Sequence, residues 1–249
     1  MGQKEFIGVG CINNIKEIIK ETRAKKILLV TGKQSYIRCN AKSQIDEILN
    51  NIYTEQFNQF EVNPKLDDVY TGVRLLKNTK FNLIIAVGGG SVIDMAKLIN
   101  ILGAQKDNDL VKYINDNVLI TEKGLPLVAI PTTAGTGSEA THFSVVYVDN
   151  VKHSLAPHFM LPDYAIVDAK LRFFENSHRS FLYAKSMVQS LSRGGVHHPV
   201  GGVAIRPSKF NSDVKRFEEF GLKIISDDLV IYLYSGVARL RYFHMRGWN

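Results

Sequence analysis

The chain of 249 residues is predicted to be an α/β protein with a doubly wound, mostly parallel, Rossmann-like sheet and helices on both faces. Two observations predict this class. Short apolar runs alternate with amphipathic segments, and the central runs are apolar throughout, as in strands covered on both faces. Two of these runs also end in turns rich in glycine or hydroxyl side chains, where open α/β sheets bind ligands.

The expected elements follow a regular order from the N-terminus. They are an edge strand at 5–9, a helix at 12–22, a buried strand at 25–31, a helix at 41–51 and a strand at 57–62. A helix carrying Val69, Val73 and Leu76 on one stripe comes next, followed by a strand at 81–87 and a helix at 92–102. After the polar segment 105–117, which holds a weak helix, strands are expected at 125–130, 143–148, 152–156 and 164–167. The strands expected at 143–148 and 152–156 flank Asp149-Asn150, a hairpin turn signal.

The strand at 81–87 runs directly into Gly88, Gly89, Gly90 and Ser91, and then into a helix. Glycine lets the backbone approach a ligand closely, and the free N–H groups and positive end of the helix favour an anion. The pattern therefore predicts a phosphate-binding turn whose backbone N–H groups cradle a pyrophosphate, with Ser91 capping or opening the helix. A tight turn without a ligand is the structural alternative.

Two charged residues, Asp94 and Lys97, lie one turn further along this helix. Asp94 could contact the ligand, or it could be a carboxylate favoured by the helix dipole. Lys97 could pair with solvent or with Asp94.

A second polar turn, residues 131–141, follows the strand at 125–130 and reads PTTAGTGSEAT. Hydroxyl groups and small residues at the end of a strand suit hydrogen bonding to the phosphates, ribose or amide of a nucleotide. A loop whose Ser and Thr side chains bond only their own backbone is the alternative.

These two segments resemble the iron-containing alcohol dehydrogenase family, whose nucleotide-binding half carries a GGGSxxDxAK turn and a PTTAGTGSE loop. Asn63-Pro64, Lys152 and the segment 161–168, LPDYAIVD, are similar to the family pattern too. The resemblance covers residues 1 to about 171 and implies an NAD(P)-binding α/β domain. It further implies a homo-oligomer and interconversion of a small aldehyde and a primary alcohol, and one branch that the chain resembles reduces phosphonoacetaldehyde.

The resemblance assigns the cofactor site to particular residues. Threonines of the second turn would line the ribose and nicotinamide, and Lys152 would contact the ribose or the ring side, unless it is a plain surface lysine. The expected cofactor-binding set is Asn63, Gly88, Gly89, Gly90, Ser91, Asp94, Thr132, Thr133, Thr136, Thr141 and Lys152.

The choice between NAD and NADP stays open. Family members commonly end their second strand in Val-Thr-Asp, where the carboxylate binds the adenosine ribose and disfavours a 2′-phosphate. This chain has Gly32 and Lys33 after Thr31 instead, so NADP is acceptable as well as NAD.

Residues 172–249 have a different character from the first 171. They contain 12 Lys and Arg against 6 Asp and Glu, a charge of +6, whereas residues 1–171 carry 19 against 18, a charge of +1. The stretch 193–202 has no helical or strand period, and only 217–225 and 229–234 suggest a helix and a strand. The resemblance implies a long helical domain here, so we expect a truncated or out-of-frame end that is poorly packed.

The same region bears on the metal. The resemblance implies a divalent ion, iron or zinc, held by an Asp and a His four residues apart plus two later histidines. No such pair follows residue 171, and the pair His197-His198 lies in a Gly-rich and Pro-rich stretch that favours exposure over ligation. The sequence therefore predicts no metal ligands and no catalytic residue that can be named.

Composition sets outer limits on function. With 45% hydrophobic and 22% charged residues and no apolar run as long as a membrane span, the sequence predicts a globular protein away from membranes. Cys11 and Cys39 form no disulfide framework or metal spacing, so a cytoplasmic location is expected. Because the basic excess lies after residue 171, no nucleic-acid partner is expected.

Three functions follow from these observations. The first is an iron-type alcohol dehydrogenase that uses NAD(P)H. The second is a non-catalytic nucleotide-binding remnant of such an enzyme. The third, a metal-dependent lyase of the related dehydroquinate-synthase fold, is disfavoured by the PTTAGTGSE loop.

Overall fold

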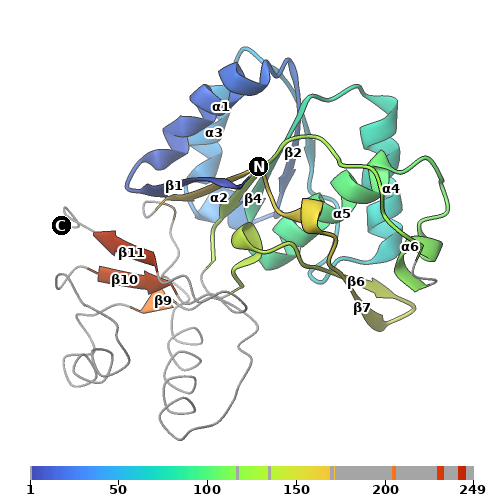
Figure 1. Cartoon of the computed structure of the whole chain (residues 1–249). Coiled ribbons are helices and arrows are strands. Elements are labelled where there is room, and N and C mark those ends of the chain that lie inside the picture. The colour runs from blue at the N-terminus through green and yellow to red at the C-terminus, as the bar shows by residue number, and fades with distance from the viewer. Residues whose placement is uncertain are drawn as a thin grey trace, which may run out of the picture.

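The computed structural model describes residues 2–115, 118–133, 136–168 and 171, together with the backbone of three later strands. The main sheet has six strands in the order β1-β8-β5-β4-β2-β3, and every pairing in it is parallel (Figure 1). These strands are β1 (Lys4–Gly8), β2 (Lys26–Thr31), β3 (Tyr53–Phe57), β4 (Leu83–Gly88), β5 (Leu127–Pro131) and β8 (Tyr164–Asp168). The predicted doubly wound, parallel α/β fold is confirmed.

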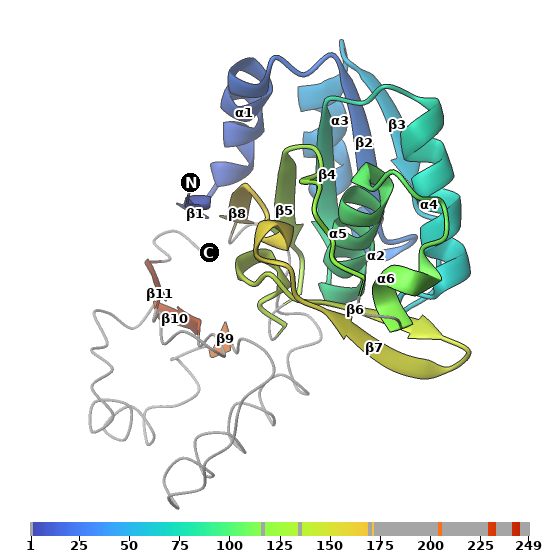
Figure 2. The same cartoon turned by 45° about the vertical axis from the view of Figure 1, so that its right-hand side comes forward.

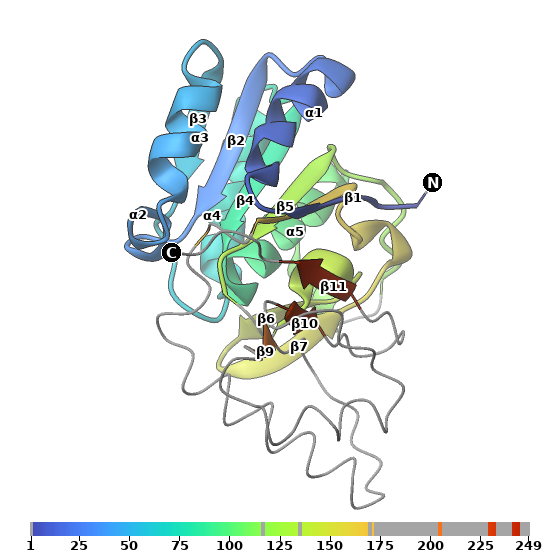
Figure 3. The same ribbon diagram turned by 90° about the vertical axis from the view of Figure 1, so that its left-hand side faces the viewer.

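Helices cover both faces of this sheet. Those on one face are α1 (Ile15–Thr22), α2 (Ser35–Arg38) and α3 (Ala41–Leu49), and Figure 3 shows α1 and α3 in front of the strands. Those on the other face are α4 (Leu66–Asn78), α5 (Gly90–Ala104) and α6 (Val111–Asn115). Three short 3-10 turns, η1 (Cys11–Asn14), η2 (Ser138–Ala140) and η3 (His158–Met160), lie in the connections.

The apolar strands supply side chains to both layers of the core. In β2, Ile27 and Leu29 belong to the cluster under α1 and α3, whereas Leu28 and Val30 belong to the cluster under α4 and α5. Successive side chains of a strand point to opposite faces, so a strand covered on both sides needs apolar residues at every position. This requirement explains why the central runs of the sequence do not alternate.

A separate antiparallel hairpin, β6 (Ser144–Val148) and β7 (Val151–Leu155), follows η2. Its turn residues Asp149 and Asn150 have φ of 49° and 64°, the left-handed values that a two-residue hairpin turn requires. The hairpin predicted from this dipeptide is therefore confirmed. Figure 2 shows it across the end of the sheet at which α5 begins.

One expected strand is misplaced. The sequence predicts a strand at 57–62, but β3 spans Tyr53–Phe57, and the segment after it is irregular. β3 is an edge strand with three polar residues, so it lacks the apolar run of a central strand. The apolar signal that suggested 57–62 comes from Phe57 and Phe60, whose rings stack 5.5 Å apart in the core.

Later in the chain, β9 (Ala204–Ile205), β10 (Leu229–Tyr232) and β11 (Arg241–His244) form a three-stranded antiparallel sheet. The strand expected at 229–234 coincides with β10. The remaining expectations for residues 172–249, including the helix at 217–225 and the exposure of His197 and His198, lie outside the described residues. No helix in the described part of the chain is both long enough and apolar enough to cross a membrane.

Candidate cofactor-binding site

The switch point of the sheet lies between β2 and β4, which are neighbours in it. The connection after β2 passes through α2 and α3 on one face, and the connection after β4 passes through α5 on the other face. Because the chain leaves the two carboxyl ends in opposite directions, this is the point at which open α/β sheets bind their ligands, in a crevice outside the strand ends. A Cβ atom on Gly32, just after β2, would lie 3.7 Å from Cγ2 of Val92 in α5, so the two connections meet at this crevice.

The glycine turn after β4 forms the wall of this crevice. α5 begins at Gly90, with Gly89 as its N-cap, so Ser91 opens the helix in its first turn rather than capping it. N–H groups in the first turn of a helix have no acceptor within the helix and are available to an anion. The position fits the predicted phosphate turn.

The three glycines of the turn are required by the space around them. None of them has a positive φ, and Gly89 has a φ of −75°, so left-handed backbone is not what requires them. A Cβ atom at any of the three would come too close to a neighbouring side chain. At Gly88 it would lie 2.5 Å from Cγ2 of Val92. At Gly89 it would lie 2.9 Å from Oγ1 of Thr133, and at Gly90 2.7 Å from Cγ2 of Thr136.

The threonine turn after β5 packs directly on the glycine turn. The N–H of Thr132 donates to the carbonyl oxygen of Gly88 over 2.9 Å, and Thr133 and Thr136 occupy the space beside Gly89 and Gly90. Thr132 is 4% exposed, and its hydroxyl oxygen is buried with no hydrogen-bond partner in the described part of the chain. Buried hydroxyl groups are normally paired, so this one is a candidate for a ligand contact.

Asn63, in the loop that follows β3, lies beside the start of α5. Its N–H donates to Oγ of Ser91 over 3.2 Å, and its φ of 68° turns the chain toward the helix start. The carbonyl oxygen of the next residue, Pro64, accepts from the N–H of Tyr147 over 2.8 Å, which docks the β6–β7 hairpin beside this loop. The structure thus brings together Asn63 and the predicted residues of both turns.

Asp94 and Lys97 face the segment that leads into β6, not the crevice. Oδ2 of Asp94 accepts from the N–H of Val145 over 3.2 Å, and Nζ of Lys97 donates to the carbonyl oxygens of Thr141 and Phe143 over 2.6 and 2.9 Å. Lys97 is 1% exposed, so the alternative in which it pairs with solvent is wrong. The apolar residues on both sides of Lys97 in α5 are the signal that could have revealed this burial.

Burial sets the protonation behaviour of these two side chains. It lowers the pKa of Lys97 to about 8, against the opposing charges of Asp94 and Glu139. Burial also raises the pKa of Asp94, although the charge of Lys97 and the N–H of Val145 hold it down in part. Oδ1 of Asp94 is buried and has no hydrogen-bond partner among the described residues.

The last two expected residues lie further along. Thr141 follows η2 and contributes its carbonyl oxygen to Lys97. Lys152 is exposed on β7, opposite Tyr147, and its charge helps to lower the pKa of Asp94. The charge of Lys152 therefore reaches Asp94 in α5.

The residues present fit a dinucleotide better than a metal ion. A helix N-terminus, a turn without Cβ atoms and the buried, unpartnered hydroxyl of Thr132 converge at the crevice, and together they offer donors for a pyrophosphate. For a metal, no group of three His, Cys, Asp or Glu side chains gathers anywhere in the described ranges.

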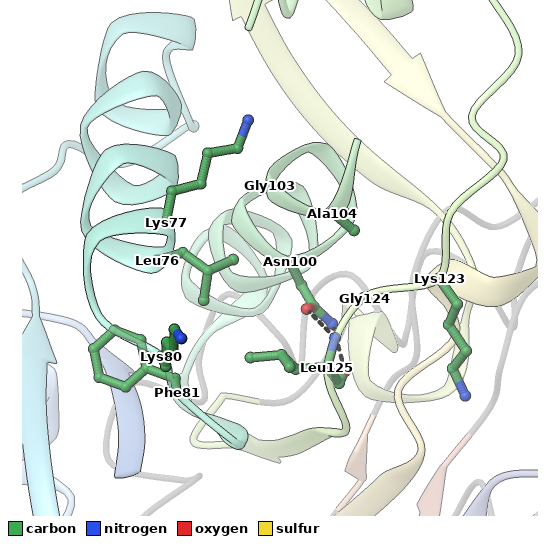
Figure 4. A pocket seen from close by; sticks show the side chains of 10 residues that line it. All are labelled: Leu76, Lys77, Lys80, Phe81, Asn100, Gly103, Ala104, Lys123, Gly124 and Leu125. Carbon is green, nitrogen blue, oxygen red and sulfur yellow. Dashed lines mark hydrogen bonds between the residues drawn. The ribbon is translucent and has the colours of Figure 1, made fainter. Parts of the chain in front are cut away.

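A hollow of about 340 Å³ lies at the opposite end of the α4 and α5 helices. Figure 4 shows it between the ends of these helices and Leu125, with Asn100 bonded to the backbone of Leu125. Lys77 and Lys123 at its rim already bind Asn108 and Asp163. None of the expected cofactor residues lines this hollow.

Comparison with known proteins identifies a family that matches this chain. The model of the family described as iron-containing alcohol dehydrogenase matches residues 3–169. Long-chain-alcohol dehydrogenase 1 of Geobacillus thermodenitrificans is 33% identical over 173 residues, which are 66% of this chain and 42% of that protein. NADH-dependent butanol dehydrogenase A of Clostridium acetobutylicum is 32% identical over 174 residues, 68% of this chain and 44% of that protein. The chain thus spans less than half the length of these two curated relatives.

Solved structures agree with this assignment. NADH-dependent butanol dehydrogenase A from Thermotoga maritima superposes with a TM-score of 0.66 and 26% identity, covering 76% of this chain and 48% of that one. Sulfoacetaldehyde reductase from Bifidobacterium kashiwanohense, in complex with NAD+, gives a TM-score of 0.66 and 25% identity over 77% of this chain and 50% of that one. With a family model that matches most of its length, this chain belongs to the iron-containing alcohol dehydrogenase family.

Proposed function

We propose that the domain formed by residues 1–171 binds NAD or NADP and supplies the cofactor half of an enzyme that interconverts a small aldehyde and a primary alcohol. The observation that carries the proposal is the convergence, at the switch point between β2 and β4, of the glycine turn, the α5 N-terminus and the Thr132 hydroxyl, which has no partner among the described residues. Relatives named as NADH-dependent butanol dehydrogenase and as a reductase in complex with NAD+ support the cofactor class.

The roles of the residues follow from their positions. The N–H groups at Gly90 and Ser91 bind the pyrophosphate, whose charge is favoured by the positive end of α5. Thr132 donates its hydroxyl hydrogen to the cofactor, and Thr133 and Thr136 fix the width of the crevice beside Gly89 and Gly90. When bound, the nicotinamide would supply or accept the hydride.

The substrate is a small aldehyde or alcohol, and a phosphonate-bearing aldehyde is one member of this class. The related structure named as a sulfoacetaldehyde reductase shows that the family includes an enzyme named for an aldehyde with an acidic group. We assign no catalytic residue in this chain, and we also propose that copies of the chain associate, as the family resemblance implies.

A binding titration tests the proposal. The full chain is titrated with NADH or NADPH, and the fluorescence of the nicotinamide is recorded. A Kd between micromolar and millimolar is expected, because the site offers phosphate contacts but has no opposing wall among the described residues. Both cofactors are compared because Gly32 and Lys33 replace the carboxylate that would exclude NADP. The absence of any response to either cofactor up to millimolar concentration would remove the proposal.

A second candidate is a non-catalytic nucleotide-binding protein. The observation that favours it is the lack of a metal-ligand group within the described ranges. Aldehyde reduction assayed with each cofactor and with added Fe²⁺ or Zn²⁺ separates the two candidates. Binding without turnover supports the second candidate, whereas metal-stimulated turnover supports the first.

A further inference from the structure

Lys97 is a buried cation whose ammonium group binds two carbonyl oxygens. Its Nζ lies 2.6 Å from the carbonyl oxygen of Thr141 and 2.9 Å from that of Phe143, and the side chain is 1% exposed. A buried ammonium group is costly unless its N–H groups are satisfied, so these two bonds are needed to keep it in place. The charges of Asp94 and Glu139 act in the same direction on its protonation.

Asp94, one turn earlier on the same helix, holds the next residues of the same segment. Its carboxylate accepts from the N–H of Val145 over 3.2 Å, and its carbonyl oxygen accepts from Oγ of Ser144 over 3.0 Å. Four hydrogen bonds therefore fasten residues 141–145 to two consecutive turns of α5.

The fastened segment connects two parts of the candidate site. Its first residue, Thr141, ends the threonine turn, and its last two, Ser144 and Val145, begin the β6–β7 hairpin, which carries Lys152 and docks on Pro64. The helix that holds it begins at the glycine turn. The position of residues 141–145 thus sets how the hairpin and the threonine turn sit relative to the phosphate-binding N–H groups.

We propose that Lys97 is a positioning residue that clamps residues 141–145 to α5 and so holds the cofactor crevice in its binding-competent form. The expected effect of Lys97 on cofactor affinity rests on the proposed function. The attachment of residues 141–145 to α5 does not depend on that function. Lys97 does not touch the cofactor. Its length and its buried ammonium group are what the clamp requires, because no other side chain on α5 bonds both of these carbonyl oxygens.

Hydrogen exchange of the full chain tests the clamp directly. In the Lys97→Met variant, exchange at residues 141–145 is expected to rise at least tenfold, whereas exchange in β4 remains as in the wild type. Lys77→Met is the matched control, because Lys77 also donates to a backbone carbonyl oxygen, that of Gln105, but at the far end of α4. Unchanged exchange at 141–145 in Lys97→Met would overturn the clamp.

Cofactor affinity tests the consequence. The Kd for NADH is expected to rise about tenfold in Lys97→Met and to stay unchanged in Lys77→Met. The titratable groups facing Lys97 are the carboxyl groups of Asp94 and Glu139 and the imidazole of His142, and all three stay in place in both variants.

The two arms separate the clamp from the proposed function. If the wild type binds neither NADH nor NADPH, the proposed function is overturned, and hydrogen exchange alone decides the clamp. If Lys97→Met does not fold, Lys97→Gln takes its place in both measurements. Unchanged exchange at 141–145 or an unchanged NADH affinity in the variant that folds would contradict the inference.

Discussion

A Cβ atom at Gly88 would lie 2.5 Å from Cγ2 of Val92, and one at Gly89 would lie 2.9 Å from the hydroxyl of Thr133. The obstacles differ in kind, since the first is a buried branched side chain in a helix and the second is the hydroxyl end of a loop residue. Three adjacent glycines in the sequence indicate a turn, but they do not say which neighbour demands each one. That information comes only from the packing of β5 and α5 on the turn.

Alanine substitutions at these two glycines should therefore have different effects. Gly88→Ala should lower the free energy of unfolding by about 1 to 3 kcal/mol, because Val92 and the helix start have to shift. Gly89→Ala should change stability by less than about 1 kcal/mol, because its φ of −75° suits alanine, and should instead weaken NADH binding. Urea unfolding and cofactor titration of both variants measure this, and equal losses of stability would contradict it.

Lys97 should give the protein a distinctive stability profile at alkaline pH. Its pKa is about 8 in the folded chain and 10.5 as its ordinary value, so between these pH values the unfolded chain holds a proton that the folded chain has lost. The free energy of unfolding should therefore rise with pH across this window, by up to about 3 kcal/mol, relative to Lys97→Met. Denaturant titrations of both proteins at pH 7.5 and 10 check the difference. A wild type that loses stability relative to the variant would contradict the assignment.

At the scale of elements, the apolar strands were predictable because both of their faces are buried. β2, β4 and β5 follow continuous apolar runs, and the hairpin follows from Asp149-Asn150. β3 was misplaced because an edge strand of mixed polarity carries no such signal, while Phe57 at its end and Phe60 in the loop after it imitate one. The site could be predicted to the extent that it lies on turns at strand ends. The clamp by Lys97 could not, because it joins residues 44 positions apart through a fold the sequence does not display locally.

The strand β8 ends in a side chain that ties the first elements of the chain together. Oδ1 and Oδ2 of Asp168 each accept a backbone N–H over 2.9 Å, from Gly10 and Ile12, and Asp168 is fully buried. Asp168→Ala leaves these N–H groups without their acceptor and should lower the free energy of unfolding by about 2 to 4 kcal/mol. Urea unfolding measures this, and Asp163→Ala, one residue before β8, serves as a comparison with a smaller expected loss, because this half-buried carboxylate accepts a single backbone N–H, that of Leu127. A loss below about 0.5 kcal/mol would show that η1 does not depend on β8.

At the scale of the whole molecule, the fold explains why the candidate site lies at the carboxyl ends of the strands and not at the opposite end. Only at the carboxyl ends do the glycine turn, the threonine turn and the Asn63 loop converge, whereas the hollow at the other end has lysines already bound to Asn108 and Asp163. Family membership accounts for residues 3–169. The domain division at about residue 171 remains a prediction, and so does the poor packing expected of the chain after it.

Chemical-shift mapping of NADH binding tests the central claim most directly. The uniformly ¹⁵N-labelled full chain is titrated with NADH, and the amides of Gly88 to Ser91, Thr132 and Thr133 are predicted to shift together along one binding curve. The amides of Leu76 to Phe81, at the opposite hollow, are predicted to stay in place. Shifts confined to the opposite hollow, or no shifts at millimolar NADH, would contradict the assignment of the cofactor site to the crevice between β2 and β4.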